Sequence, residues 1–357
     1  MPEYTVVPAH LQKDKQVIID LWRQNLADIN HLEGKYDWNF LNNPFGPGQI
    51  WILEADGQPI GTTSLGMRLL KLGETLTTAG VACDLAVNKD HRFLQPALLL
   101  QRALLSTSHA GVPVVYGVPN PAGASVLKYV GYREFCSVHR YAKPLRVSHY
   151  LERSHKFGAI VPFIGRMADY GFAALQSFRR GRVNTRVTQI FPCFDERFDE
   201  LWSRMDSAHA ALTVRDRQFL NWRYDECPLR RYKTLGLLTE DESSLLGYLI
   251  YYVEGHSAIC ADLLVPSGED LSCLVSSWAT VAWRDGLASL SISCSDGALP
   301  AGLLGLGFTR RSASATTRPD RSGRREQCKT LFTHGRLPFT AHAVARGWYY
   351  TEGDSPY

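Results

Sequence analysis

One pattern occurs twice in this chain and constrains its fold more than any other feature. The motif W-x-aromatic-x-x-x-P covers residues 38–44 and recurs at residues 222–228. Three further pairs follow in the same order: an aliphatic-Gly pair at 60–61 and 246–247, Asp-Leu-x-Val at 84–87 and 262–265, and Gly-aromatic at 131–132 and 307–308. Ordered self-similarity of this kind indicates a tandem duplication. Because 357 residues exceed the usual size of one compact core, we expect two related domains.

Hydrophobic periodicity predicts the same plan in each half. An amphipathic helix near 17–26 precedes a hairpin whose turn contains Asp56-Gly57, a strong hairpin signal. The expected strands are 50–54, 59–65, 80–87 and 114–118 in the first half and 234–238, 245–253, 258–265 and 289–294 in the second, with first-half helices at 96–108 and 122–129. Strands that alternate with helices predict an α/β (α+β) fold, a mixed and largely antiparallel sheet flanked by helices in each domain.

The expected domain boundaries follow from the repeat. The first domain covers residues 1–145, a helical connector covers 146–190, and the second domain covers 191–357. Basic and apolar residues are mixed in the segment 150–186, which fits either a helix that covers both domains or a segment that rests on a membrane surface. A stretch rich in Ser, Thr, Arg and Gly at 312–327 predicts a loop.

Composition excludes several classes of protein. Hydrophobic residues make up 45% and charged residues 21%, as in folded soluble proteins. The net charge of +4 is small for a nucleic-acid-binding protein, so no nucleic-acid partner is expected. There is neither an apolar run of about 18 residues nor an N-terminal secretory signal pattern. The eight cysteines are scattered without a C-x-x-C pair, which predicts free thiols, no metal site and a cytoplasmic location.

The stretch 84–97 carries the strongest chemical signal. A buried strand is expected to end at Val87, a polar turn follows, and a helix is expected to begin at Pro96. The unpaired N–H groups and the positive dipole end of a helix attract anions, and Arg92 adds a positive charge to this turn. The junction is therefore a candidate pyrophosphate site.

This stretch resembles the acyl-CoA-binding motif of GNAT-type N-acyltransferases, V-x-x-x-x-(R/Q)-x-x-G-x-(G/A). Val87, Arg92 and Ala97 occupy matching positions, and the family's later Asn and Gly-aromatic elements are matched at Asn120 and at 131–132.

The resemblance covers roughly residues 1–140 and extends to the second half through the repeat. Tandem GNAT and Fem-like proteins associated with exopolysaccharide gene clusters look most similar, including a C-terminal W-Y-Y-T-E-G-D signature at 348–354. The resemblance implies two tandem GNAT-like domains and an acyl-CoA co-substrate.

The resemblance also implies roles for individual residues. Backbone N–H groups near Leu85, Ala86 and Val87 would polarise the thioester oxygen. Asp84 is the candidate general base and Tyr129 a candidate acid, although the family's usual tyrosine position holds Leu127. The expected cofactor-binding residues are Leu85, Ala86, Val87, Arg92, Phe93, Leu94, Gln95, Ala97 and Asn120.

Two departures from the family pattern affect the cofactor site. Gln95 replaces the first motif glycine, and Pro96 removes one N–H donor. In the second half the equivalent turn has no arginine and carries Glu269 and Asp270, whose charges would repel phosphates. The second domain is therefore expected not to bind CoA in the usual way.

The repeated aromatic motifs allow two interpretations. Trp38, Trp222 and Tyr224 would line an acceptor groove, or they would anchor a helix on the sheet. Arg223 would pair with an anionic acceptor, or it would form a surface salt bridge.

The sequence thus predicts a cytoplasmic N-acyltransferase, most simply an N-acetyltransferase acting on a primary amine of a small molecule such as an amino sugar. Two alternatives stay open: a Fem-like aminoacyl transferase that uses charged tRNA, and a non-catalytic binding module in polysaccharide assembly.

Overall fold

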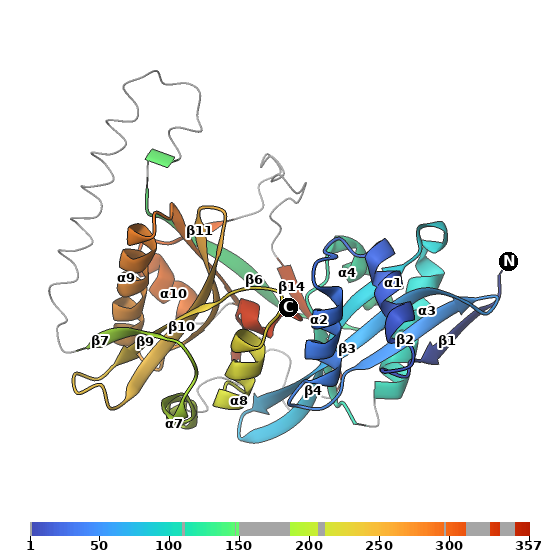
Figure 1. Ribbon diagram of the computed structural model, residues 1–357, viewed down its shortest axis with the longest axis horizontal. Helices are drawn as coiled ribbons and strands as arrows, with labels where there is room; N and C mark the ends of the chain where they lie inside the picture. Colours follow the sequence, from blue (N-terminus) through green and yellow to red (C-terminus); the bar gives the residue numbers. More distant parts are fainter. Residues whose placement is uncertain are drawn as a thin grey trace, which may run out of the picture. The chain divides into compact units, whose positions relative to one another are not determined.

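The computed structural model describes residues 2–108, 111–146, 148–149, 186–205, 211–295, 298–311, 329–335 and 347–357. The chain divides into two compact units (Figure 1). The first consists of residues 1–137, 207–231 and 329–357, and the second of residues 138–206 and 232–328. The expected segments 150–186 and 312–327 lie outside the described residues, apart from Arg186.

The first unit is built on a mixed sheet in the order β1-β2-β3-β4-β5-β14. Neighbouring strands are antiparallel, except that β4 and β5 are parallel. The strands are β1 (Tyr4–Pro8), β2 (Gln49–Ala55), β3 (Gln58–Leu72), β4 (Thr75–Val87), β5 (Val114–Gly117) and β14 (Lys329–Gly335). The β2–β3 hairpin turns at Asp56 and Gly57, both with positive φ, as the Asp-Gly pair predicts.

Helices cover both faces of this sheet. Alternate residues of β2 point to opposite faces: Ile50 and Ile52 pack with the cluster of α1 and α2, whereas Trp51 and Leu53 pack with the cluster of α3. The helical elements of this unit are α1 (Lys15–Asn25), α2 (Leu32–Tyr36), the π-helical turn η1 (Asp37–Leu41), the 3-10 turn η2 (Lys89–His91), α3 (Leu94–Ser108) and α4 (Pro121–Tyr129).

Two segments from late in the chain complete the first unit. Strand β8 (Ala211–Thr213) pairs with the end of β3, and β15 (Trp348–Tyr349) pairs with β8. They are accompanied by α8 (Arg217–Leu220), the π-helical turn η3 (Asn221–Asp225) and the 3-10 turn η4 (Glu352–Asp354).

The compact units therefore differ from the linear domains expected at 1–145 and 191–357. Residues 211–231 and 347–357 lie in the first unit because their strands extend its sheet and their side chains enter its interior.

The second unit contains a sheet with a similar order of strand directions. Strands β7, β9, β10 and β11 are antiparallel neighbours, β11 and β12 are parallel, and β12 pairs with residues 138–144 of β6. The elements are β6 (Arg133–Pro144), β7 (Val187–Phe191), α7 (Glu196–Arg204), β9 (Lys233–Leu238), β10 (Leu245–Glu254), β11 (Ser257–Leu264), α9 (Gly268–Arg284), β12 (Ser289–Ser295), α10 (Ala298–Gly305) and β13 (Thr309–Arg311), which pairs with β6.

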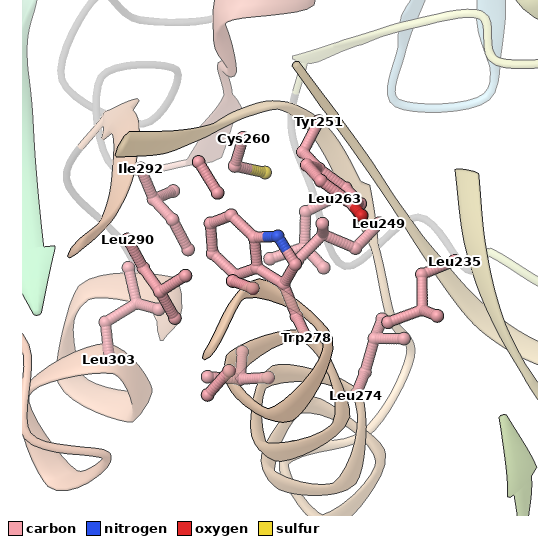
Figure 2. Packing of buried hydrophobic residues seen from close by; sticks show 14 of the residues in the cluster. Leu235, Leu249, Tyr251, Cys260, Leu263, Leu274, Trp278, Leu290, Ile292 and Leu303 are labelled. Carbon is pink, nitrogen blue, oxygen red and sulfur yellow. The ribbon is translucent and has the colours of Figure 1, made fainter. Parts of the chain in front are cut away.

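The core of the second unit lies between this sheet and α9. Trp278 of α9 is fully buried and points into a cluster of side chains from the four central strands and α10 (Figure 2). Labelled members are Leu235, Leu249, Tyr251, Cys260, Leu263, Leu290, Ile292 and Leu303. All four strands predicted for this half are confirmed as β9, β10, β11 and β12. The observed ends of each strand differ from the predicted ends by at most one residue.

Candidate active site

A cavity of about 620 Å³ opens in the first unit where β4 and β5 stop pairing. The two strands pair only from Ala79 to Val81 on β4, although β4 continues to Val87. Residues 82–87 are therefore not paired with β5, and they form one wall. The volume is within the range of small-molecule sites. The other lining residues are Asn25, Leu26, Arg92, Phe93, Ala97, Gln101, Gly117, Val118, Pro119, Asn120, Gly123, Val126, Leu127, Pro356 and Tyr357.

A β-bulge shapes the β4 wall of the cavity. The register between β3 and β4 shifts between Thr62 and Ser64, so that Asp84 and Leu85 together face a single residue of β3. Asp84 has a positive φ of 49°, which is uncommon for a residue with a side chain. A bulge re-aims backbone and side chain, and here it lies where β4 borders the cavity.

The Asp84 side chain is buried, and each of its carboxylate oxygens accepts a hydrogen bond. Its side chain is 4% exposed, and Oδ1 accepts a hydrogen bond from the Lys35 ammonium at 2.6 Å. Its other oxygen, Oδ2, accepts a hydrogen bond from the hydroxyl of Tyr357. The Lys35 ammonium also lies 3.9 Å from the centre of the Tyr357 ring and 4.7 Å from the Trp22 ring. The predicted base is thus part of a cluster of a carboxylate, an ammonium and a phenol.

The turn after β4 brings Arg92 to the cavity. Its Nε donates to the carbonyl of Val87 at 2.8 Å, and a terminal nitrogen donates to the Asn25 side chain at 3.1 Å. These bonds fix the guanidinium beside the end of β4, where it lines the cavity.

Helix α3 begins at Leu94, two residues before the expected start. The first four residues of a helix have no partner within it, and Pro96 has no N–H. The donors at this end are therefore the amides of Leu94, Gln95 and Ala97. The Phe93 amide, also expected to bind phosphate, donates instead to the carbonyl of His91 at 2.9 Å. Of the predicted residues of this turn, Arg92, Phe93 and Ala97 line the cavity.

The opposite wall comes from β5 and α4. Asn120 caps α4, because its Oδ1 accepts a hydrogen bond from the Gly123 amide at 2.8 Å. Leu127, at the position of the family's usual tyrosine, lines the cavity, whereas Tyr129 does not and is 68% exposed. The structure therefore places the candidate acid Tyr129 outside the lining of the cavity.

The aromatic motifs lie in the interior of the first unit. Trp38 and Trp222 are stacked with ring centres 4.8 Å apart, and Arg223 and Tyr224 are also buried. The Arg223 guanidinium lies 5.4 Å from the Trp38 ring and donates to the carbonyl of Gly353 at 3.0 Å. None of these four residues lines the cavity, which agrees with packing rather than with a groove.

The equivalent junction of the second unit has different chemistry. Asp262 is fully buried, lies next to a register shift between β10 and β11, and accepts a hydrogen bond from the Tyr248 hydroxyl at 3.3 Å. At the start of α9, Arg186 pairs with Asp270 at 2.8 Å and with Glu269 at 3.0 Å. The turn that corresponds to the Arg92 turn of the first unit thus holds two carboxylates that are already paired with Arg186.

Two residues of the Asp84 cluster were not found from the sequence. Lys35 lies in a short helix without a recognisable motif. Tyr357 directly follows the signature at 348–354, but nothing in that signature indicates that the chain returns to the end of β4.

The comparisons with known proteins come from structure alone. No protein-family model matches the sequence, and a search of curated proteins finds no match either. A conserved protein from Enterococcus faecalis, described as a probable N-acyltransferase, matches with a TM-score of 0.64 at 9% identity over 93% of this chain and 72% of that one. A tandem GNAT protein from the clavulanic acid biosynthesis pathway matches with a TM-score of 0.54 at 15% identity, over 93% of this chain and 98% of that one.

The fold is GNAT-like. N-myristoyltransferase from Saccharomyces cerevisiae, solved with bound myristoyl-CoA, is also similar, with a TM-score of 0.57 at 9% identity over 93% of this chain and 79% of that one. These identities are low, and they show the fold only. The GNAT-like fold expected from the V-x-x-x-x-R pattern is therefore confirmed in its coarse form: a large mixed sheet flanked by helices.

Two further observations concern the described residues only. They contain no group of three or more His, Cys, Asp or Glu side chains arranged to hold a metal ion. Among them, no helix combines the length and the apolar character needed to cross a membrane.

Proposed function

We propose that the protein is an acyl-CoA-dependent N-acyltransferase whose active site is the cavity of the first unit. One observation carries this proposal: a single cavity reaches from the Arg92 turn and the start of α3 to Asp84. An anion-binding turn and a carboxylate in one space are what transfer from a CoA thioester to an amine requires.

Different residues along the cavity would bind the pyrophosphate, the thioester and the acceptor amine. Arg92 and the amides of Leu94, Gln95 and Ala97 would bind the pyrophosphate. The thioester would lie along residues 85–87, where the bulge in β4 changes the direction of the backbone amides. The acceptor amine would enter near Asp84. CoA supplies the activated acyl group and leaves as the thiol.

The acceptor we propose is a primary amine of a small molecule, such as an amino sugar, and the simplest acyl group is acetyl. The described residues that line the cavity include one cation, Arg92, and one anion, Asp84. This lining offers little to a polyanion, because a tRNA-binding site needs many cationic contacts. It therefore favours CoA over the aminoacyl-tRNA of the Fem-like alternative.

The second unit is proposed to have no CoA site. The Arg186 ion pairs with Asp270 and Glu269 place two carboxylates at the start of α9, which disfavours a pyrophosphate there. Association with exopolysaccharide assembly, a cytoplasmic location and membrane contact through 150–186 stay predictions from the sequence.

The non-catalytic alternative predicts a site filled by side chains. A cavity that is open from Arg92 to Asp84 argues for the enzyme.

Calorimetric titration with acetyl-CoA tests the proposal. We expect micromolar binding by the intact protein and loss of binding in Arg92→Glu. Arg102→Glu is the matched control, because Arg102 is an exposed residue of α3 that does not line the cavity and the change in charge is identical. The absence of binding of acetyl-CoA and of longer acyl-CoAs to the intact protein would contradict the proposal.

A further inference from the structure

We propose that Tyr357 is a catalytic residue that relays the proton of the acceptor amine to Asp84. This inference rests on the proposed acyl transfer and deepens it, since it assigns the proton path of the same site. It concerns a residue outside the stretch 84–132, which carries the residues matched to the GNAT-type motifs.

The geometry of Asp84 calls for such a relay. Both carboxylate oxygens already accept hydrogen bonds, one from Lys35 and the other from Tyr357, and the side chain is 4% exposed. An amine that approached Asp84 directly would have to share an oxygen that already holds a hydrogen-bond donor. Tyr357 is one of the residues that line the cavity, and in the proposed relay a bound amine approaches the phenol oxygen that Asp84 already holds.

A balanced proton path follows from this arrangement. The amine nitrogen attacks the thioester carbon, the C–N bond forms, and the carbonyl π electrons move to oxygen. The nitrogen then loses a proton to the Tyr357 oxygen, while the Tyr357 hydroxyl proton passes to Asp84 Oδ2. The electron pair on the oxyanion then re-forms the C=O bond as the C–S bond breaks, and the thiolate takes that proton back through the same hydroxyl. Amine and thioester become amide and free thiol, and the Asp84 carboxylate is regenerated.

The protonation state of Tyr357 suits a relay better than a simple acid. Burial first, and then the neighbouring Asp84 charge, raise the pKa of its hydroxyl well above its ordinary value. Tyr357 therefore stays protonated at neutral pH, and it gives up its proton only as it receives another.

Lys35 is the positioning residue of this cluster. Its ammonium contacts Asp84 Oδ1 and the faces of the Tyr357 and Trp22 rings. The ion pair at 2.6 Å, together with the contact to the Tyr357 ring, holds the carboxylate beside the Tyr357 hydroxyl.

Buried arginines hold the segment that carries Tyr357. Asp354 pairs with Arg215 at 2.8 Å, and both side chains have no exposed surface. Arg223 donates to the Gly353 carbonyl at 3.0 Å, and Arg68 donates to the Pro356 carbonyl at 3.4 Å. Three buried arginines, from β3, from the loop between β8 and α8 and from η3, thus fix residues 353–356, and with them the place of the next residue.

Other side chains near the cavity are less suited to this role. Tyr129 is exposed and outside the cavity. Burial raises the pKa of the Cys83 thiol to about 12, so the thiol stays protonated and does not act as a nucleophile or a base.

The test compares Tyr357→Phe with Tyr350→Phe in the full chain. Tyr350 lies close to the same segment, its buried hydroxyl bonds Ser355, and it does not line the cavity. The readouts are acetyl-CoA affinity by calorimetry and release of CoA thiol, without acceptor and with glucosamine as the probe amine. We expect Tyr357→Phe to bind acetyl-CoA within twofold of the intact protein and to lose about 10²-fold or more in kcat. We expect Tyr350→Phe to retain kcat within threefold.

A pH profile separates a relay from a structural effect. The kcat of the intact protein should level off with rising pH, whereas that of Tyr357→Phe should keep rising in proportion to hydroxide, which replaces the lost relay. The relay is overturned by an unchanged kcat in Tyr357→Phe, by an equal loss in Tyr350→Phe, or by an intact protein that binds acetyl-CoA and releases no CoA under either condition. An intact protein that binds no acyl-CoA contradicts the proposed function itself, and the relay with it.

Discussion

Trp38 and Trp222, which are 184 residues apart, bond each other reciprocally in the core of the first unit. The indole nitrogen of Trp38 donates to the carbonyl of Trp222 at 2.6 Å, and that of Trp222 donates to the carbonyl of Trp38 at 2.9 Å. The rings are nearly parallel, at 17°. Each tryptophan lies in a π-helical turn, so the two copies of the repeated motif adopt the same local structure and pack against each other.

This pairing predicts a large loss of stability in Trp222→Ala. Removal of the buried ring leaves a cavity and deprives the Trp38 carbonyl of its indole donor, and we expect a loss of about 3–5 kcal/mol in the free energy of unfolding. Urea unfolding followed by circular dichroism measures it. Trp202→Phe, at a half-buried tryptophan of α7, is the control and should change stability by less than about 1 kcal/mol. Similar losses of unfolding free energy in both variants would show that the reciprocal Trp38–Trp222 pair does not make an unusually large contribution to stability.

The Arg215–Asp354 pair predicts strong coupling between two single substitutions. Because both side chains are fully buried, Arg215→Ala leaves an uncompensated carboxylate and should cost about 3–5 kcal/mol. The double variant Arg215→Ala with Asp354→Ala should lose less than the sum of the two single variants. A double-mutant cycle by urea unfolding measures the coupling, and additive losses would show that the charges do not interact.

Two substitutions at Asn120 are expected to separate its effect on stability from its effect on acetyl-CoA binding. Asn120→Ala removes the cap of α4 and should cost about 1 kcal/mol, whereas Asn120→Asp keeps an acceptor for the Gly123 amide and should retain stability. The new negative charge in the cavity should nevertheless weaken acetyl-CoA binding about tenfold, equivalent to about 1.4 kcal/mol. Thermal unfolding and calorimetry of the same samples measure both effects. Unchanged affinity in Asn120→Asp would place the phosphates away from this wall.

The Asp195 carboxylate is expected to make a pH-dependent contribution to the free energy of unfolding of the second unit. Its hydrogen bonds with Arg197 lower the pKa of the carboxyl below its ordinary value of 3.8, so the ionised form is favoured in the folded state. The stabilisation is complete above the unfolded pKa and is lost as the pH falls through the lowered folded value. We expect Asp195→Asn to cost about 0.5–1 kcal/mol at pH 7 and to cost less at pH 3, below the ordinary pKa of 3.8. Urea unfolding at both pH values checks this, and a cost that does not change with pH would contradict it.

Much of the local structure follows from the sequence. The Asp56-Gly57 turn predicted the β2–β3 hairpin, because these residues tolerate the positive φ that a tight turn requires. The short helix expected at 122–129 is α4 at Pro121–Tyr129, and the buried strand expected at 114–118 is β5 at Val114–Gly117. Helix α3 begins earlier than expected, at Leu94, because Pro96 is tolerated anywhere in a first turn.

Motif reasoning located the cavity only in part. The V-x-x-x-x-R pattern indicated the Arg92 turn and Asp84, because both belong to one continuous segment around the end of β4. It gave no indication of Lys35 or Tyr357, which come from distant parts of the chain and bear no motif.

The sequence by itself determined many of the helices and strands, since these depend on residues close together in the chain, although not β1, β6, β8 or β14. The tandem duplication and the anion-binding turn stay predictions from a recurring pattern and a local motif. Only the tertiary structure decided that residues 211–231 and 347–357 join the first unit. It also decided that Trp38 packs on Trp222 and that Tyr357 meets Asp84. Those contacts depend on buried charge pairing and side-chain packing between segments far apart in sequence, and no local pattern encodes them.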